Sequence, residues 1–272
     1  MVKFAGILGL VGLTLPLCGG VQTKPLLVTG YRQMYNLDFG AAHVTFAKHM
    51  AQHPEDPMGP VSDAAAFLFS EFDRLHILQG EFFLHDENFR SKHKLAPDAA
   101  ANQLFERRLA EGEALAQRRL SADPRECNAL FASVLVRGLR SDYYGLIERR
   151  YWKTLQSTKE SRQLAEQLLA IDGDYHDAWI AIGVENYLLS LKPAPVRWVL
   201  QLAGNKTDRE YGLEKLRITA EKGTYLRPFA QLLFAVAALR DKRLDEARSI
   251  LRGLSAEFPR NRLYVEELAR LR

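Results

Sequence analysis

Cysteine is scarce in this chain, because only two of its 272 residues, Cys18 and Cys127, are of that type. Two cysteines exclude a disulfide framework and a multi-cysteine zinc site. Neither sign of charge dominates, since 37 basic residues stand against 33 acidic ones and leave a net charge of +4. So small an excess does not call for nucleic acid as a partner, and we expect none.

Long apolar runs are also missing after residue 20. No stretch in that part of the sequence approaches the 18 or so apolar residues of a membrane span. The first twenty residues differ. Lys3 precedes an apolar run from Phe4 to Leu17, and small residues follow it. This order predicts a signal peptide over residues 1–20 and an exported protein, periplasmic or secreted. A buried N-terminal helix is the alternative.

Cys18 raises the question of lipidation. A lipoprotein signal needs a small residue directly before its cysteine, whereas Pro16 and Leu17 stand here. We therefore expect contact with a membrane only if Cys18 is nevertheless lipidated. Cleavage after Gly20 would leave Cys127 as the one cysteine of the mature chain, and we expect it to be a structural residue at a helix start.

Motifs for catalysis, phosphate binding and metal binding are absent from the sequence. His49 and His53 stand four residues apart, but Met50 occupies the place where a zinc-protease helix carries Glu. Surface histidines are the preferred interpretation. We expect no catalytic residue, no metal and no cofactor.

The pattern of apolar residues after about Lys24 is helical almost throughout, and sustained strand-like alternation is missing. The sequence therefore predicts an all-α fold. Capping boxes at Ser157–Glu160 and Thr207–Glu210 predict helix starts, and Gly223 predicts a helix end.

One spacing recurs along the chain: a small residue, then positions four and seven further on, then Pro or Gly at position twelve. The small residue lets a neighbouring helix approach, and the Pro or Gly ends the helix. Four copies fit: Ala42, Phe46, His49 and Pro54; Gly112, Ala116, Arg119 and Pro124; Ser161, Ala165, Leu168 and Gly173; Ala247, Leu251, Leu254 and Pro259.

This spacing resembles the second helix of the tetratricopeptide repeat family. Trp179, Ile182 and Gly183 also match the family's first helix, whereas Ser133 and Val134 depart from it. The resemblance implies an α-solenoid of antiparallel helix hairpins over residues 25–272. The last positions of successive copies lie 70, 49 and 86 residues apart, whereas the family period is about 34, so the repeats are degenerate. Residues 30–272 leave room for roughly five helix pairs at a repeat of ~34–49 residues. A non-repeating helical bundle is the alternative.

Two stretches are expected to interrupt the repeats, near residues 79–95 and 191–205. Pro193 and Pro195 break the second stretch, and Val196 to Leu202 predicts a short amphipathic helix. We expect it to cover the end of the core. Contact with a membrane or a partner is the alternative.

In the tetratricopeptide family the first helix of each repeat lines a groove that binds peptides or protein segments. Carried over to this sequence, the candidates are Asn128, Phe131, Leu135, Asp177, Ile180, Val184 and Tyr187. The apolar members of the set fit core packing equally well. Asn128, Asp177 and Tyr187 are more informative, because burying them requires hydrogen-bonding partners.

The resulting hypothesis is a non-catalytic, exported scaffold or adaptor that binds a peptide or partner protein in the cell envelope. One alternative is an envelope enzyme, or a subunit of one, with a site around His85–Asn88 or Trp198. The other is a structural protein anchored by a lipid on Cys18.

Overall fold

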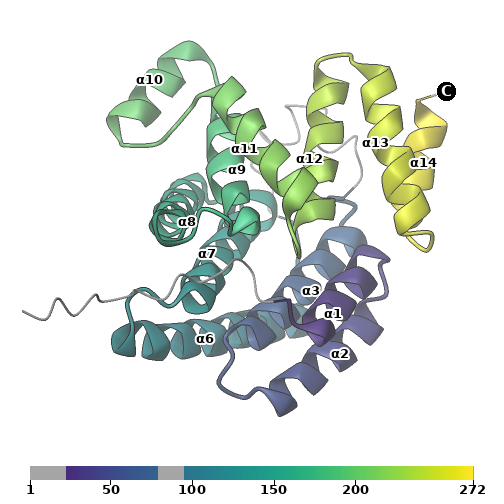
Figure 1. Cartoon of the computed structure of the whole chain (residues 1–272). Helices are drawn as coiled ribbons and strands as arrows, with labels where there is room; N and C mark the ends of the chain where they lie inside the picture. The colour runs from purple at the N-terminus through teal and green to yellow at the C-terminus, as the bar shows by residue number, and fades with distance from the viewer. Residues whose placement is uncertain (1–22, 79–94, 272) are drawn as a thin grey trace, which may run out of the picture.

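The computed structural model of this protein describes residues 23–78 and 95–271, and that part of the chain folds into helices with no strand (Figure 1). The prediction of an all-α fold is confirmed. Its α-helices are α1 (Pro25–Tyr35), α2 (Phe39–Gln52), α3 (Met58–Arg74), α6 (Ala99–Ala122), α7 (Cys127–Asp142), α8 (Tyr151–Ile171), α9 (Trp179–Ser190), α10 (Ala194–Leu202), α11 (Arg209–Lys222), α12 (Arg227–Arg240), α13 (Leu244–Glu257) and α14 (Arg262–Arg270). A π-helix, η1 (Tyr143–Glu148), follows α7, and a 3₁₀ turn, η2 (His176–Ala178), precedes α9. None of the described helices combines the length and the apolar character needed to cross a bilayer.

Each long helix packs mainly on its neighbours along the chain (Figure 1). The closest pairs are α1 with α2, α3 with α6, α7 with α8, α9 with α11, and α12 with α13. The second helix of each pair also packs on the first helix of the following pair. At the C-terminal end, α14 packs on α13.

Small residues stand where helices approach most closely. A Cβ atom on Gly183 of α9 would lie 2.8 Å from the backbone nitrogen of Leu216 in α11. A Cβ atom on Gly112 of α6 would lie 2.4 Å from a methyl carbon of Val61 in α3. Since neither position has room for a side chain, the spacing found in the sequence reflects real helix-to-helix contact.

The predicted helix ends are also correct. In all four copies of the spacing the helix stops two residues before the Pro or Gly, at Gln52, Ala122, Ile171 and Glu257. The structure adds a fifth instance in α11, where Gly212, Leu216 and Thr219 repeat the spacing and the helix ends at Lys222. Sequence analysis missed this instance because Thr224 stands where Pro or Gly is expected.

One capping-box prediction was wrong. Ser157 lies in the middle of α8, which begins at Tyr151, and its side chain is buried. The chain turns earlier because Arg149 adopts a left-handed conformation, with φ of 58°. The other prediction was off by one residue, since Asp208 rather than Thr207 caps α11 by accepting a hydrogen bond from the Tyr211 N–H. Gly223 ends that helix as predicted.

The two ends of the described chain meet, and we call this contact between α1 and residues 224–226 and 257–264 the seam. Tyr225 stacks on Tyr31 with ring centroids 5.2 Å apart, and the Tyr35 hydroxyl donates to the Tyr225 carbonyl. The Asn261 side-chain amide donates to the Tyr35 carbonyl at 2.8 Å. The row of helices therefore curves until its last members touch its first.

Two predicted segments need comment. Residues 191–205 form α10 and its connections, but Leu200 is the one residue of α10 that is buried, so the expectation that this helix covers the core was wrong. Most of the other interruption, residues 79–94, lies outside the described residues, as do the predicted signal peptide and Cys18. The proposed site at His85–Asn88 lies there too.

Candidate functional site

The three predicted groove residues on α7 lie inside the fold. Phe131 is fully buried and packs on the Tyr175 ring, with centroids 5.0 Å apart, and Leu135 belongs to the same core. Asn128 is half-buried, and its side-chain amide donates a hydrogen bond of 2.8 Å to Asp56. Each has a structural partner within the chain, and binding at these positions stays a prediction.

Asp177 holds the start of α12 in place. Its carboxylate accepts hydrogen bonds from the backbone N–H groups of Thr224, Tyr225 and Leu226, at 2.9, 3.2 and 2.8 Å. The side chain is fully buried, and this burial raises the pKa of the carboxyl although the three backbone donors lower it. A carboxylate at a helix N-terminus satisfies N–H groups that the helix leaves unpaired. The structure therefore gives Asp177 a role inside the fold.

The predicted residues on α9 differ in their surroundings. Ile180 is buried and Val184 packs against the core. Tyr187 is only 1% exposed, and its hydroxyl makes no hydrogen bond within the described part of the chain. The Arg209 guanidinium lies 6.0 Å from the centroid of its ring. Arg209 also lines a cavity on this side of the molecule, which does not include Tyr187 itself.

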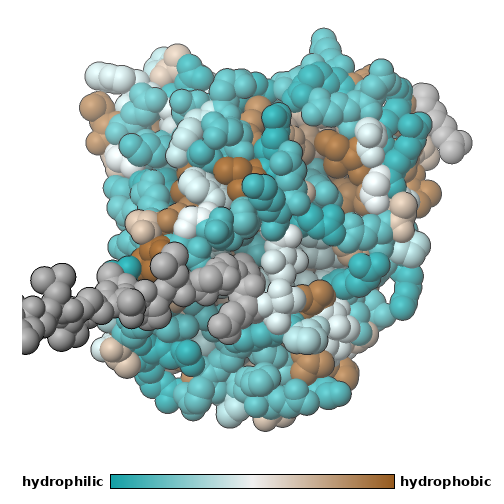
Figure 2. All heavy atoms as spheres, viewed as in Figure 1, coloured by the Kyte–Doolittle hydropathy of each residue, from teal (hydrophilic) through white to brown (hydrophobic). Residues whose placement is uncertain are grey.

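That cavity is a groove of about 430 Å³ formed by α11 and α12. In Figure 2 hydrophilic and hydrophobic residues lie side by side over these two helices. Its lining consists of two apolar residues and six charged ones: Arg209, Glu210, Leu213, Glu214, Arg217, Phe234, Asp241 and Arg243. Equal numbers of cations and anions make the groove neutral as a whole.

Asp241 joins two of the arginines. Both oxygens of its carboxylate accept from Arg209 at 2.6 Å, and one also accepts from Arg243 at 3.0 Å. Burial opposes ionisation of Asp241, but the hydrogen bonds from both guanidinium groups outweigh it and lower the pKa of the carboxyl. This ion-pair bridge fixes one side of the groove.

Arg217 differs from the other two arginines. Its guanidinium lies 5.9 Å from the centroid of the Phe234 ring, and it makes no ion pair with any residue that the structure describes. Glu214, one helical turn away, pairs with Lys215 instead. An arginine stacked on a ring and lacking an acidic partner presents donors suited to a carboxylate. Sequence reasoning missed this site, although Arg209, Leu213 and Arg217 stand four residues apart on one helix face.

The described histidines do not form a metal site. His49 was expected at the surface but is buried, and its Nε2 lies 2.7 Å from Asp56. His53 is exposed, as predicted. No group of three or more His, Cys, Asp or Glu residues in the described ranges is arranged to hold a metal ion.

His43 and Asp63 form a second pair, with Nδ1 of the histidine 2.6 Å from the carboxylate. Arg108 donates to the other carboxylate oxygen at 2.8 Å. Such a pair orients an imidazole, but a catalytic triad also needs a nucleophile in hydrogen-bond reach of the histidine. Among the described residues no hydroxyl or thiol makes that bond.

Cys127 lies buried at the start of α7, as predicted. Cys18, the other cysteine of the sequence, lies outside the described residues.

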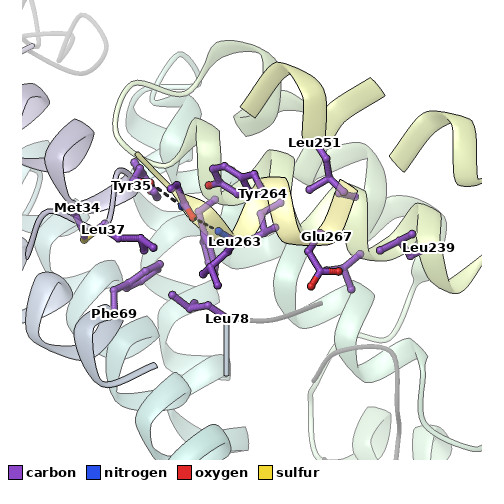
Figure 3. A pocket seen from close by; sticks show the side chains of 15 residues that line it. Met34, Tyr35, Leu37, Phe69, Leu78, Leu239, Leu251, Leu263, Tyr264 and Glu267 are labelled. Atoms are coloured by element: carbon purple, nitrogen blue, oxygen red, sulfur yellow. Dashed lines mark hydrogen bonds between the residues drawn. The ribbon is translucent and has the colours of Figure 1, made fainter. Parts of the chain in front are cut away.

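A second cavity lies at the seam, between α1, α3, α12, α13 and α14 (Figure 3). It measures about 40 Å³ and its walls are almost entirely apolar. The few polar groups of the lining have partners: the Asn261 amide donates to the Tyr35 carbonyl, and Glu267, labelled in Figure 3, accepts from Arg270. A space of this size holds about one water molecule, so we interpret it as a packing defect.

The comparisons with known proteins add no identification: no family model matches the chain, and no curated protein is significantly similar to it.

Proposed function

We propose that this chain is a non-catalytic scaffold or adaptor built as a degenerate tetratricopeptide-like α-solenoid, exported to the cell envelope, where it binds a peptide or a segment of a partner protein. The succession of helix pairs supports the architecture, since each pair packs on the next. The export part of the proposal rests on the sequence of residues 1–20 alone.

The observation that carries the binding proposal is Arg217 in the groove of α11 and α12. The groove is open, polar and neutral, which suits a segment of mixed charge rather than a nucleic acid. Arg217 supplies one guanidinium without an acidic partner, stacked on Phe234. We therefore propose that the bound segment places an Asp or Glu side chain, or a terminal carboxylate, against Arg217.

A peptide-display selection against the purified protein tests this proposal. We expect selected peptides to share an acidic position, and Arg217→Glu to weaken their binding at least tenfold, since a lost charge-assisted hydrogen bond is replaced by repulsion. Arg252→Glu is the matched control, because Arg252 is exposed on α13 away from the groove. Failure to select any peptide, or equal binding by both variants, would remove the proposal.

The alternative of an envelope enzyme gains no support from the described residues. Trp198 lies on the exposed face of α10 and lines neither of the two cavities.

A further inference from the structure

The orientation of α10 is unusual for a short amphipathic helix. Trp198, Val199 and Leu202 are 65%, 55% and 72% exposed, and Val196 is 44% exposed. At about 100° per residue these side chains cover an arc of roughly 160° on one side of the helix. The apolar face of α10 therefore points away from the protein.

The opposite side of the same helix carries the half-buried Arg197 and the buried Leu200, which face the protein body. Arg197 donates to the carbonyl of Ser190, and the Gln201 amide donates to the Thr207 hydroxyl. Beyond the helix end, Lys159 of α8 donates to the carbonyl of Ala203 at 2.9 Å. These contacts, with the buried Leu200, fix which side is turned outward.

α10 also projects from the body of the molecule. In Figure 1 it stands at the upper left, joined to α9 and α11 and apart from the other helices, and hydrophobic residues appear at the same edge in Figure 2. An exposed apolar patch of this kind marks an interaction site. A single projecting helix is convex, so a partner must be deformable to cover its exposed face. The headgroup layer of a lipid bilayer is deformable in this way.

The charges around α10 have one sign. Lys192 precedes the helix, Lys206 follows it, and Arg197 lies on it, whereas residues 191–207 contain no acidic side chain. Both lysines are exposed and make no ion pair with the described residues. Two carboxylates that flank this stretch in the sequence are engaged, since Glu185 pairs with Arg162 in the interior and Asp208 caps α11.

From these observations we infer that α10 docks the protein onto an anionic membrane surface. Trp198, Val199 and Leu202 enter the boundary between headgroups and acyl chains, and Lys192 and Lys206 contact lipid phosphates. A helix with tryptophan and leucine on one face and basic flanks binds membranes in this way, parallel to the surface. The inference is independent of the groove of α11 and α12 and of any lipid on Cys18.

Flotation of the full chain with vesicles tests this inference. Vesicles of phosphatidylglycerol and phosphatidylethanolamine are compared with vesicles of phosphatidylcholine alone. We expect binding to the anionic vesicles only, weakened by added salt, because salt screens the lysines. Binding that does not distinguish the two compositions would contradict the role given to charge.

Matched variants locate the contact. Val199→Ser with Leu202→Ser is expected to weaken vesicle binding about tenfold. The control, Val44→Ser with Leu244→Ser, removes the same two residue types from exposed positions on α2 and α13 and is expected to change nothing. Equal loss in the two double variants, or no loss in either, would overturn the inference.

The charge contribution has its own pair of variants. Lys192→Glu with Lys206→Glu is expected to abolish the preference for anionic vesicles. Lys48→Glu with Arg252→Glu changes the net charge equally at exposed positions elsewhere and is expected to keep the preference. A loss common to both pairs would show attraction by net charge alone and would contradict docking through α10.

Trp198 fluorescence separates docking through α10 from attachment by another part of the chain. Quenching by brominated lipid is expected in the wild type and is expected to fall in Trp198→Phe, which keeps Trp152 and Trp179. Unchanged quenching would place the contact elsewhere. Analytical sedimentation tests whether a second copy of the chain binds this face instead. If the wild type binds no vesicles but forms a dimer, and the Val199→Ser, Leu202→Ser variant does not form it, the face belongs to a second copy and the inference is overturned.

Discussion

The seam and α10 both present aromatic and apolar side chains, but in opposite surroundings. At the seam, Tyr31, Tyr35 and Tyr225 are all buried, and hydrogen bonds satisfy the polar groups beside them. On α10, Trp198 is 65% exposed, and hydrogen bonds engage the polar side instead. The same type of residue therefore stabilises the fold in one region and remains at the surface in the other.

The difference follows from what lies next to each region. α1 meets residues from both halves of the chain, so its tyrosines find partners on the Tyr225 segment and on α14. α10 is bounded by Pro193 and by Gly204, and its connections hold it away from the neighbouring helices. Amphipathic pattern alone does not decide which face of a helix is buried, because a neighbour must be there to cover it.

The largest effect is expected from Tyr225→Ala at the seam. Tyr225 is buried, stacks on Tyr31 and accepts a hydrogen bond from the Lys24 N–H. Removing the ring should lower the free energy of unfolding by about 3–5 kcal/mol in denaturant titrations. Trp152→Ala, at a side chain that is 81% exposed, should change it by less than about 0.5 kcal/mol. Similar losses in both variants would break the comparison.

The second largest effect is expected from a change at Asp56, which joins Lys24, next to the start of α1, to α2 and α7. Its buried carboxylate lies 2.7 Å from His49 Nε2 and accepts from Lys24 and Asn128. Burial opposes ionisation, but these hydrogen bonds outweigh it and hold the pKa well below the ordinary range of aspartate. Asp56→Asn should cost about 2–4 kcal/mol at pH 7.

The same carboxylate predicts the direction of a pH dependence. Because its folded pKa is lower than its unfolded one, its contribution is complete above the ordinary aspartate range and is lost as pH falls below it. Unfolding measured from pH 7 to 3 should show a smaller acid-induced loss in Asp56→Asn than in the wild type. Equal slopes in the two proteins would show that Asp56 is not the group responsible.

A smaller loss is expected from Asn261→Ala. The side-chain oxygen caps α14 through the Leu263 N–H, and the amide donates to Tyr35. Leaving these buried groups unpaired should cost about 1–3 kcal/mol. Arg260→Ala, which removes the exposed ion pair with Asp38, should cost less than about 1 kcal/mol. Thermal or denaturant unfolding of both variants checks this, and the loss of unfolding free energy should be larger for Asn261→Ala than for Arg260→Ala.

The smallest effect on stability is expected from α10. Val199→Ser with Leu202→Ser removes exposed side chains, so the free energy of unfolding should change by less than about 0.5 kcal/mol. Circular dichroism and denaturant titration check this. A loss of 2 kcal/mol or more would mean that α10 covers the core after all, as the sequence first indicated.

The sequence predicted much of the local structure. The small residues Gly112 and Gly183 stand at close helix contacts, and the Pro and Gly positions mark helix ends correctly. These features depend on backbone sterics and side-chain size within a few residues, which a single sequence displays. The start of α8 was wrong because Ser157 faces the interior and the turn at Arg149 has no common sequence signal.

The candidate site was predicted less well. Asp177 and Asn128 were chosen as polar residues on a presumed groove, but they bind the backbone near Tyr225 and the side chain of Asp56. Both partners lie far away in the sequence, so no local pattern indicates them. The groove with Arg217 lies between α11 and α12, whose repeat went unrecognised because Thr224 replaces the usual Pro or Gly.

The sequence by itself determined that this chain is helical, where most helices end and which positions must stay small, because these properties follow from period, steric size and turn chemistry within one or two helical turns. Only the tertiary structure decided which faces are covered. The curvature that brings α1 against Tyr225 and α14 buries side chains that would otherwise line an open surface, and the connections of α10 leave an apolar face without a neighbour. Both outcomes depend on contacts between residues far apart in the chain, and no local sequence pattern predicts such contacts.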